Sequence, residues 1–350
     1  MFCPQCSRAF EEGRIECPFD GAQLTDRFLD FIPNQRSRTS GAILADRYKL
    51  LGVIDRGGWA RIFLGEDLVA NRPVAVKVLD AAHASDPVKR ERFLREAEAA
   101  KIIEHANVPD TFFVGTRGDG TPFFVMEFLF GETLGAMLRR IDAVAPTVAI
   151  GIAIEVARAL EAAHAISIVH RDVKPDNIFL VGKIDAFHAV KVLDFGLAKS
   201  SERSITAGGI VLGTVEYMAP EQCLSEPVDG RTDVYGLGVV LYRALSGRLF
   251  ADGETMEQKL AQQLSTIPAR LRDLAPHVPP GLDAIVTRAL RKNPGERYAT
   301  MTEMLHDLES VSRGEEVPSV AFGEDVYVPR SAFAGKVMSV LVEKLQTGQA

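Results

Sequence analysis

The sequence has little cysteine, no long apolar run and no signal-like N-terminus, and each absence excludes a class of protein. Only four of its 350 residues are cysteines, which is too few for a secreted domain held by disulfides. Charged residues such as Glu155 and Lys336 interrupt the most apolar stretches, so no window reaches the roughly 18 apolar residues of a membrane span. The first residues, Met-Phe-Cys-Pro-Gln-Cys, lack the apolar segment of a signal peptide.

An excess of positive charge is also missing. The formal net charge is −7, which gives no electrostatic reason to expect nucleic acid or an anionic membrane as a partner. Hydrophobic residues make up 47% and charged residues 25% of the chain, the proportions of an ordinary globular protein with a sizeable core. Together with the low cysteine content, this composition leads us to expect a cytoplasmic protein.

Three of the four cysteines lie close together, in residues 1–25. They form two similar units, Cys3-Pro-Gln-Cys6 and Cys17-Pro-Phe-Asp20. Three thiolates and one carboxylate can complete the tetrahedral shell of Zn²⁺, and so short a segment has little other source of folding energy. The arrangement resembles half of a zinc ribbon in which Asp20 replaces the fourth cysteine. The alternative is an unstructured terminus with incidental cysteines.

The rest of the chain divides by pattern into three parts. Residues 26–46 form a polar linker that contains Gly, Ser and Pro. Residues 47–312 begin with short β-type runs and one strong helix candidate at 86–103, and then become mainly helical. This order predicts a small strand-rich lobe before a larger helical one. Residues 313–350 form a tail in which 331–345 are predicted to be an amphipathic helix.

One polar cluster stands out in the middle of the chain. The stretch from Val169 to Leu180 reads Val-His-Arg-Asp-Val-Lys-Pro-Asp-Asn-Ile-Phe-Leu, and Pro175 prevents a continuous helix through it. A carboxylate, an ammonium group and an amide on one loop are suited to holding a phosphorylated ligand with its metal while the carboxylate receives a proton. From these residues alone, His170 and Asp172 are both candidates for the base.

Several motifs in a fixed order resemble those of eukaryotic-like serine/threonine protein kinases of the kind common in bacteria. The stretch Val74-Ala75-Val76-Lys77 is similar to the lysine motif of the third strand of that family. His170-Arg171-Asp172 is similar to its catalytic loop, Asp194-Phe195-Gly196 to its magnesium-binding motif, and Ala219-Pro220-Glu221 to the end of its activation segment. The resemblance implies an α+β, two-lobed protein kinase fold for residues 47–312.

The resemblance also implies roles for individual residues. Lys77 would hold the α- and β-phosphates of ATP and be oriented by Glu96, and Asp172 would accept the proton of the attacking hydroxyl. Lys174 would approach the γ-phosphate, and its position two residues after Asp172 is similar to the serine/threonine class. Asn177 and Asp194 would hold Mg²⁺. The expected nucleotide contacts are Gly57, Gly58, Ile62, Ala75, the gatekeeper Met126, and Glu127 and Leu129 through their backbones.

Two further roles follow from the same resemblance. His170 is expected to be a structural residue packed beneath the catalytic loop. Arg171 is expected to pair with a regulatory phosphate on the activation segment. Thr206 is the first candidate for that phosphorylated residue, followed by Ser204 and Ser201.

The glycine-rich loop departs from the family pattern Gly-x-Gly-x-x-Gly. The aligned residues here run from Asp55 to Ala60, so the middle glycine remains as Gly57 with Gly58 beside it. Asp55 would bring a carboxylate near the bound phosphates and add a Cβ to the backbone there.

The activity implied is transfer of the γ-phosphoryl group of ATP, with Mg²⁺, to serine or threonine hydroxyls of protein substrates. Self-association for trans-autophosphorylation of the activation loop is an expected partner interaction. The main alternative is a pseudokinase that acts as a signalling scaffold, for which the altered glycine loop is the only support. A small-molecule kinase of related fold is disfavoured by the Ala219-Pro220-Glu221 motif, which in the family builds a platform for protein substrates.

Overall fold

The structure, a computed structural model, forms two compact units from alternating parts of the chain. It describes residues 14–17, 21, 23–24, 41–183, 186–195 and 215–318, together with positions 329, 335 and 338–339. Unit 1 is formed by Met1–Thr133 and Phe179–Leu193, and unit 2 by Leu134–Ile178 and Asp194–Ala350. Each unit is described by itself below.

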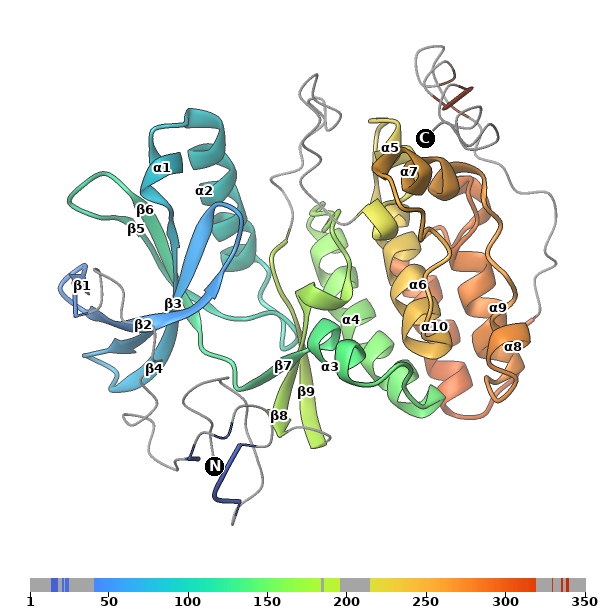
Figure 1. The fold of residues 1–350 in the computed structure, drawn as a ribbon, viewed down its shortest axis with the longest axis horizontal. Coiled ribbons are helices and arrows are strands. Elements are labelled where there is room, and N and C mark those ends of the chain that lie inside the picture. Colours follow the sequence, from blue (N-terminus) through green and yellow to red (C-terminus); the bar gives the residue numbers. More distant parts are fainter. Residues whose placement is uncertain are drawn as a thin grey trace. The chain divides into compact units, whose positions relative to one another are not determined.

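Unit 1 contains a six-stranded antiparallel sheet with the order β1-β2-β3-β4-β6-β5 (Figure 1). Its strands come from consecutive hairpins, so neighbours in sequence are mostly neighbours in the sheet. They are β1 (Ile43–Leu44), β2 (Tyr48–Arg56), β3 (Ala60–Asp67), β4 (Arg72–Leu79), β5 (Thr111–Thr116) and β6 (Pro122–Glu127).

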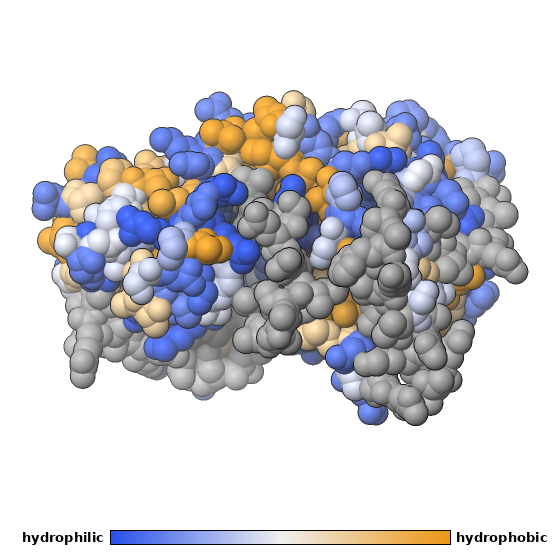
Figure 2. All heavy atoms as spheres, turned by 90° about the horizontal axis from the view of Figure 1, so that it is seen from above, coloured by the Kyte–Doolittle hydropathy of each residue, from blue (hydrophilic) through white to orange (hydrophobic). Residues whose placement is uncertain are grey.

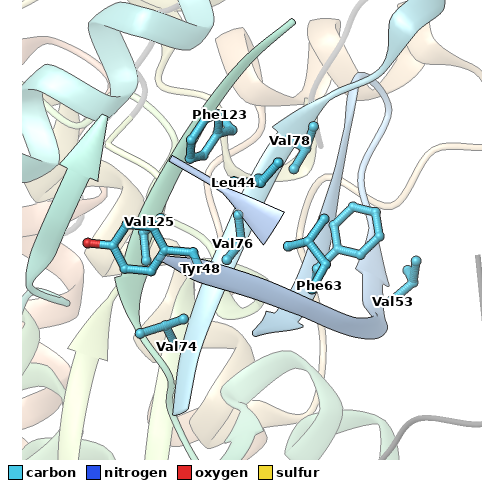
Figure 3. Packing of buried hydrophobic residues seen from close by; sticks show 10 residues of the cluster. Leu44, Tyr48, Val53, Phe63, Val74, Val76, Val78, Phe123 and Val125 are labelled. Atoms are coloured by element: carbon cyan, nitrogen blue, oxygen red, sulfur yellow. The ribbon is translucent and has the colours of Figure 1, made fainter. Parts of the chain in front are cut away.

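Alternating side chains of these strands form one core on a single face of the sheet. Val74, Val76 and Val78 of β4 point to the same side because successive strand residues face opposite ways. They pack with Phe123 and Val125 of the neighbouring strand β6, as Figure 3 shows. This packing holds β4, the strand of Lys77, in register with its neighbours.

Helices α1 (Ala81–Ala84) and α2 (Pro87–Ile102) follow β4 directly. The start of α2 is specified locally, because the Asp86 side chain accepts hydrogen bonds from the amides of Val88 and Lys89 and Pro87 occupies the first helical position. Its face with Phe93 and Ala97 packs against Phe124 of β6. The helix predicted at 86–103 is therefore present and fixed to the sheet.

A second, three-stranded sheet contains β7 (Gly131–Thr133), β8 (Ile178–Lys183) and β9 (Ala186–Val192) in that order. The sequence predicts strands at 178–181 and 190–193. Both strands are present, but they are longer than predicted, because β8 extends to Lys183 and β9 begins at Ala186. The outer half of β9 alternates between exposed and half-buried residues, which leaves too weak an apolar pattern to be recognised as a strand.

Unit 2 is mainly helical (Figure 1). Its most extensively buried helix, α6, is capped by the Asp229 side chain at its start and by Gly247, at φ 72°, at its end. Its α-helices are α3 (Leu134–Arg140), α4 (Pro146–Ala165), α5 (Pro220–Cys223), α6 (Gly230–Ser246), α7 (Met256–Ser265), α8 (Leu271–Leu274), α9 (Pro280–Ala289) and α10 (Met301–Ser312). Short 3-10 turns are η2 (Pro175–Asn177), η3 (Val215–Tyr217) and η4 (Pro294–Glu296).

Few residues of the two ends of the chain are described. Of the tail, Gly335, Met338 and Ser339 are helical, and Met338 packs against an apolar cluster that includes Val215 and Leu260. The linker at 26–46 lies mostly outside the described residues, so its boundaries stay a prediction. Among the described helices, none is both long and apolar enough to cross a membrane. The face shown in Figure 2 mixes hydrophilic and hydrophobic side chains.

Candidate active site

Lys77 of β4 is held by an ion pair within unit 1. It sits opposite Ile62 of β3 and Phe124 of β6, in the most buried part of the strand. Its Nζ lies 2.5 Å from Oε1 of Glu96 on α2. An ammonium group in an apolar strand requires an anionic partner, and the fixed position of α2 provides one. The pair fixes the ammonium group on the face of β4 opposite the core of Val76 and Val78.

An apolar surface lies beside this lysine. Ile62, Ala75 and Met126 belong to one cluster built around Leu64 and Phe128, and Ala75 is directly opposite Met126 in the β4–β6 register. Residues from three adjacent strands therefore contribute to one apolar cluster, which is the chemistry that a planar ring requires.

The segment after β6 supplies polar backbone to the same region. The amide of Glu127 donates to the Asp110 carbonyl (2.9 Å), and the Glu127 carboxylate binds Lys191 Nζ at 2.7 Å. The Glu127 amide and carboxylate are thus both used within unit 1. Leu129 follows in the half-buried connection to β7.

The altered glycine turn joins β2 to β3. Gly57 donates from its amide to the Ala60 carbonyl (2.9 Å), and neither Gly57 nor Gly58 has a positive φ. Asp55 is paired opposite Ile62, one residue before the last pair of the strand, and its own φ is not positive either. The Cβ of Asp55 therefore causes no backbone strain. What distinguishes this loop is the exposed Asp55 carboxylate.

The catalytic-loop residues converge within unit 2. Asp172 Oδ2 lies 2.9 Å from Nζ of Lys174, and the Nδ2 group of Asn177 donates to the Asp172 carbonyl (2.9 Å) and to Oδ2 (3.3 Å). The 3-10 turn η2, which begins at Pro175, carries Asn177 back toward Asp172. A carboxylate, an ammonium group and an amide thus form one connected cluster.

The backbone of this loop is held from beneath by Asp233 of α6, which is 1% exposed. Its carboxylate accepts the amides of His170 and Arg171, both at 2.8 Å, and lies 2.7 Å from Nε2 of His164. Arg171 has φ 65°, a left-handed conformation that costs a non-glycine residue roughly 1–3 kcal/mol. The buried carboxylate offsets that cost, so the strained loop persists.

His170 is fully buried, and its ring packs on Phe195 with centroids 4.7 Å apart. Its Nδ1 lies 3.2 Å from the Asp172 amide, from which it can accept a hydrogen bond. A histidine without exposed surface cannot reach a substrate hydroxyl, whereas Asp172 is partly exposed. Between the two candidates left open by the sequence, the geometry favours Asp172 as the proton acceptor.

A buried ion pair anchors the Ala219-Pro220-Glu221 motif. Arg297 donates to both carboxylate oxygens of Glu221, at 2.8 and 2.9 Å, and its remaining donors bind the carbonyls of Arg231, Arg291 and Lys292. Burial alone would raise the pKa of Glu221, but the charge and hydrogen bonds of Arg297 lower it below its ordinary value. The ion pair thus uses every guanidinium donor of Arg297, toward the carboxylate or toward backbone carbonyls.

The donor chemistry at Asn177 and Asp194 suits Mg²⁺, which prefers carboxylate and amide oxygens. Because Asn177 Nδ2 donates to Asp172, its Oδ1 is the atom that remains for a cation. Asp194 adopts φ 52°, a second left-handed position beside the buried Phe195.

Several predicted residues lie outside the described part of the chain. These are Cys3, Cys6, Asp20, Gly196, Ser201, Ser204 and Thr206. Cys17 is described and is buried; its carbonyl accepts the amide of Gly21 (3.0 Å), which closes a tight turn. In the described regions, no group of three or more His, Cys, Asp and Glu side chains could hold a metal ion.

Two contributors to the site were missed by sequence reasoning. His164 binds Asp233 across 69 positions, and Gln222 donates from Nε2 to the Arg171 carbonyl (2.8 Å). Both residues lie in ordinary helical segments, and no local pattern distinguishes them from solvent-facing polar residues.

Comparison with known proteins identifies a family that matches the same region of the chain. The family described as protein kinase domain matches residues 48–308. The chain is 39% identical over 281 residues to a probable serine/threonine-protein kinase of Corynebacterium efficiens, an alignment that covers 77% of this chain and 42% of the relative. It is 38% identical over 290 residues to the serine/threonine-protein kinase PknB of Mycobacterium tuberculosis, covering 81% of this chain and 46% of the relative. This chain therefore spans less than half the length of these relatives.

A solved structure has a similar fold. The crystal structure of the Mycobacterium tuberculosis PknI kinase domain matches with a TM-score of 0.59 and 26% sequence identity. The match covers 79% of this chain and 99% of that one.

Proposed function

Because the chain belongs to the protein kinase family, we propose that it transfers the γ-phosphoryl group of ATP to serine and threonine hydroxyls of proteins. The observation that carries the proposal is the cluster of Asp172, Lys174 and Asn177, connected by contacts of 2.9 to 3.3 Å. Phosphoryl transfer requires mainly positioning and stabilisation of spread negative charge, and this cluster offers both a proton acceptor and a cation.

Each residue of the cluster has a definite task in this proposal. Asp172 accepts the proton of the attacking hydroxyl as the bond to phosphorus forms. Lys174, at 2.9 Å from Asp172, places positive charge beside the transferred group. The serine/threonine class is supported by Lys174 at this position and by the names of relatives that are 38% and 39% identical.

The nucleotide is assigned to the residues near Lys77. Glu96 positions the ammonium group of Lys77, which binds the α- and β-phosphates. Ile62, Ala75 and Met126 provide the apolar contacts for adenine. Mg²⁺, held by Asn177 and Asp194 when bound, neutralises charge on the phosphates.

Arg171 is assigned to regulation. Arg171 directly precedes the catalytic carboxylate of Asp172, and its backbone is held in a strained conformation. A phosphate that pairs with its guanidinium therefore affects the conformation of the catalytic loop. Thr206 is the first residue proposed to carry that phosphate, by autophosphorylation between two copies of the chain. We expect Thr206→Ala to lower the specific activity of the phosphorylated protein, and equal activity of the two proteins would refute the assignment.

For the N-terminal segment we propose a zinc site of Cys3, Cys6, Cys17 and Asp20. The support is chemical, from the ligand set, together with the burial of Cys17 beside a tight turn. A stoichiometric zinc content that Cys17→Ser abolishes is expected. Absence of zinc from the wild-type protein purified without chelators would refute the site. We propose a cytoplasmic location because a thiolate site of this kind requires reduced cysteines.

A pseudokinase that acts as a signalling scaffold is the second candidate, and Asp55 is the observation that favours it. An exposed carboxylate at the end of β2 opposes phosphate binding. Isothermal titration calorimetry with ATP and Mg²⁺ distinguishes an active kinase from a scaffold that does not bind nucleotide, because only the kinase would bind ATP.

The proposed activity is tested by incubating the purified chain with γ-labelled ATP, Mg²⁺ and casein. We expect label on serine and threonine of casein and none when EDTA is present. Incorporation that persists in the Asp172→Asn protein, or label on tyrosine alone, would contradict the proposal.

A further inference from the structure

Helix α7 contacts the short turn η3 through both apolar and polar side chains, and the function proposed above assigns no role to these contacts. Residues Val215–Tyr217 precede the Ala219-Pro220-Glu221 motif, and they pack against α7 through an apolar cluster that includes Met218 and Leu264. Two polar contacts from α7 reach the same turn, one from Gln263 and one from Lys259. An apolar contact alone would allow sliding, whereas directed hydrogen bonds fix a register.

Gln263 is the central residue of this contact and is fully buried. Its Nε2 donates to the carbonyls of Val215 (3.2 Å) and Glu216 (2.5 Å), and its Oε1 accepts the hydroxyl of Tyr235 at 2.6 Å. All three contacts use the amide in a single orientation, because only the nitrogen donates and only the oxygen accepts. The side chain is therefore locked, and it locks the backbone of the turn.

A buried lysine stands behind Gln263. Lys292, which is also fully buried, donates from Nζ to the Tyr235 hydroxyl (3.1 Å) and lies 4.7 Å from the ring centroid of Phe250. With the lysine as donor, the tyrosine hydroxyl points its own hydrogen at Gln263. The chain from Lys292 through Tyr235 thus sets the direction of the Gln263 amide.

A second contact fixes the same turn at its surface side. Lys259 of α7 forms an ion pair with the Glu216 carboxylate, and both side chains are partly buried. The start of α7 is secured by a capping box between Thr255 and Gln258, so Lys259 is presented from a helix with a defined end.

The turn is also tied to the catalytic loop. Gln222 accepts the Ala219 amide at its Oε1 (3.0 Å) and donates from Nε2 to the carbonyl of Arg171, the residue before Asp172 (2.8 Å). A shift of the segment at 215–219 therefore changes its position relative to Asp172. Contacts that hold this segment affect where a hydroxyl bound on it meets the catalytic carboxylate.

We infer that Gln263 and Lys259 are positioning residues that hold residues 215–217 as a rigid platform for the protein substrate. The inference rests on the proposed protein kinase activity. Neither residue touches the catalytic cluster, so their loss should weaken protein-substrate binding and leave nucleotide binding intact. A merely structural role would instead lower the fraction of folded protein, which lowers the apparent kcat and leaves both Michaelis constants unchanged.

The test uses the full chain with Gln263→Met, a change that keeps the volume and removes the amide. We expect the KM for casein to rise about tenfold, equivalent to about 1.4 kcal/mol of lost positioning, with the KM for ATP within twofold of wild type. The matched control is Ser265→Ala on the same helix, whose hydroxyl binds only the Ala261 carbonyl of α7 among the contacts seen here. This control should match wild type in both constants.

A second pair of variants keeps the inference testable if Gln263→Met does not fold. Lys259→Met should raise the KM for casein severalfold, and Lys259→Arg, which preserves the ion pair with Glu216, should restore it. Wild-type activity with unchanged KM for casein in Gln263→Met and Lys259→Met would overturn the inference. A wild-type protein that binds ATP but phosphorylates no protein would instead refute the proposed function itself.

Discussion

Replacement of Asp233 by asparagine should weaken the contacts that hold the catalytic loop without creating a cavity in the core. The change keeps the shape of the side chain but replaces one oxygen, so one of the amides of His170 and Arg171 would face an NH₂ group in place of an acceptor. The negative charge beside His164 is lost as well. We expect both lower stability and lower catalytic rate, because the same contacts hold the left-handed Arg171 next to Asp172.

The magnitude follows from the contacts that are lost. One hydrogen bond to a charged group contributes roughly 1.5–3 kcal/mol, and a buried donor left unsatisfied adds a penalty of similar size. Relaxation of Arg171 from φ 65° offsets part of this loss of free energy, because such a conformation costs roughly 1–3 kcal/mol. The net loss should be about 2–4 kcal/mol of unfolding free energy. The rate should fall at least tenfold because the relaxed loop moves Asp172.

Urea denaturation and steady-state phosphorylation of casein measure the two effects. Asp229→Asn is the matched control, because it is the same chemical change at the exposed start of the same helix, where Asp and Asn cap about equally well. It should change stability by less than about 0.5 kcal/mol. If Asp233→Asn behaved like Asp229→Asn in both assays, the role of the buried carboxylate in holding the loop would be refuted.

Three further predictions concern other parts of the chain. Arg297→Met leaves the buried Glu221 carboxylate without its partner and should cost about 3–5 kcal/mol of unfolding free energy in urea, so a loss below about 1 kcal/mol would contradict the anchoring role. Burial raises the pKa of the Cys223 thiol to about 12, so iodoacetamide at pH 8 should label its peptide only after denaturation, and rapid labelling of the native protein would count against the packing. Asp55→Asn removes a surface charge worth roughly 0.5–1 kcal/mol near bound phosphates and should lower the KM for ATP about two- to fivefold; an unchanged KM would place the carboxylate away from the nucleotide.

Much of the fold was accessible from sequence because its signals are local. The helix at 86–103 begins with an Asp-Pro pair that caps it. The strand β4 is an apolar run in which Lys77 is the one charged residue after Arg72. The hairpin turn at Gly118-Asp119-Gly120 uses a positive φ at Gly120, as glycine in a turn permits. Patterns of this kind depend only on near neighbours, which explains why they can be read without a structure.

The contacts that hold the site were not accessible in this way. Asp233 and His164 are 69 positions apart, and Gln222 reaches Arg171 across 51. Whether a polar side chain in a helix turns inward depends on packing that no local pattern records. At Asp55 the strand accommodates the added Cβ without a positive φ, so only the charge of this residue distinguishes it from a glycine.

The most direct test of the central claim compares wild type with Asp172→Asn and His170→Asn in the transfer of phosphate from ATP to casein. Loss of a positioned base costs roughly 10²–10⁴ in rate, so Asp172→Asn should lower kcat by at least a hundredfold while ATP affinity, measured by titration, stays within about threefold. His170→Asn should act mainly through stability. An Asp172→Asn protein that kept more than a tenth of the wild-type kcat would contradict the assignment of Asp172 as the catalytic carboxylate.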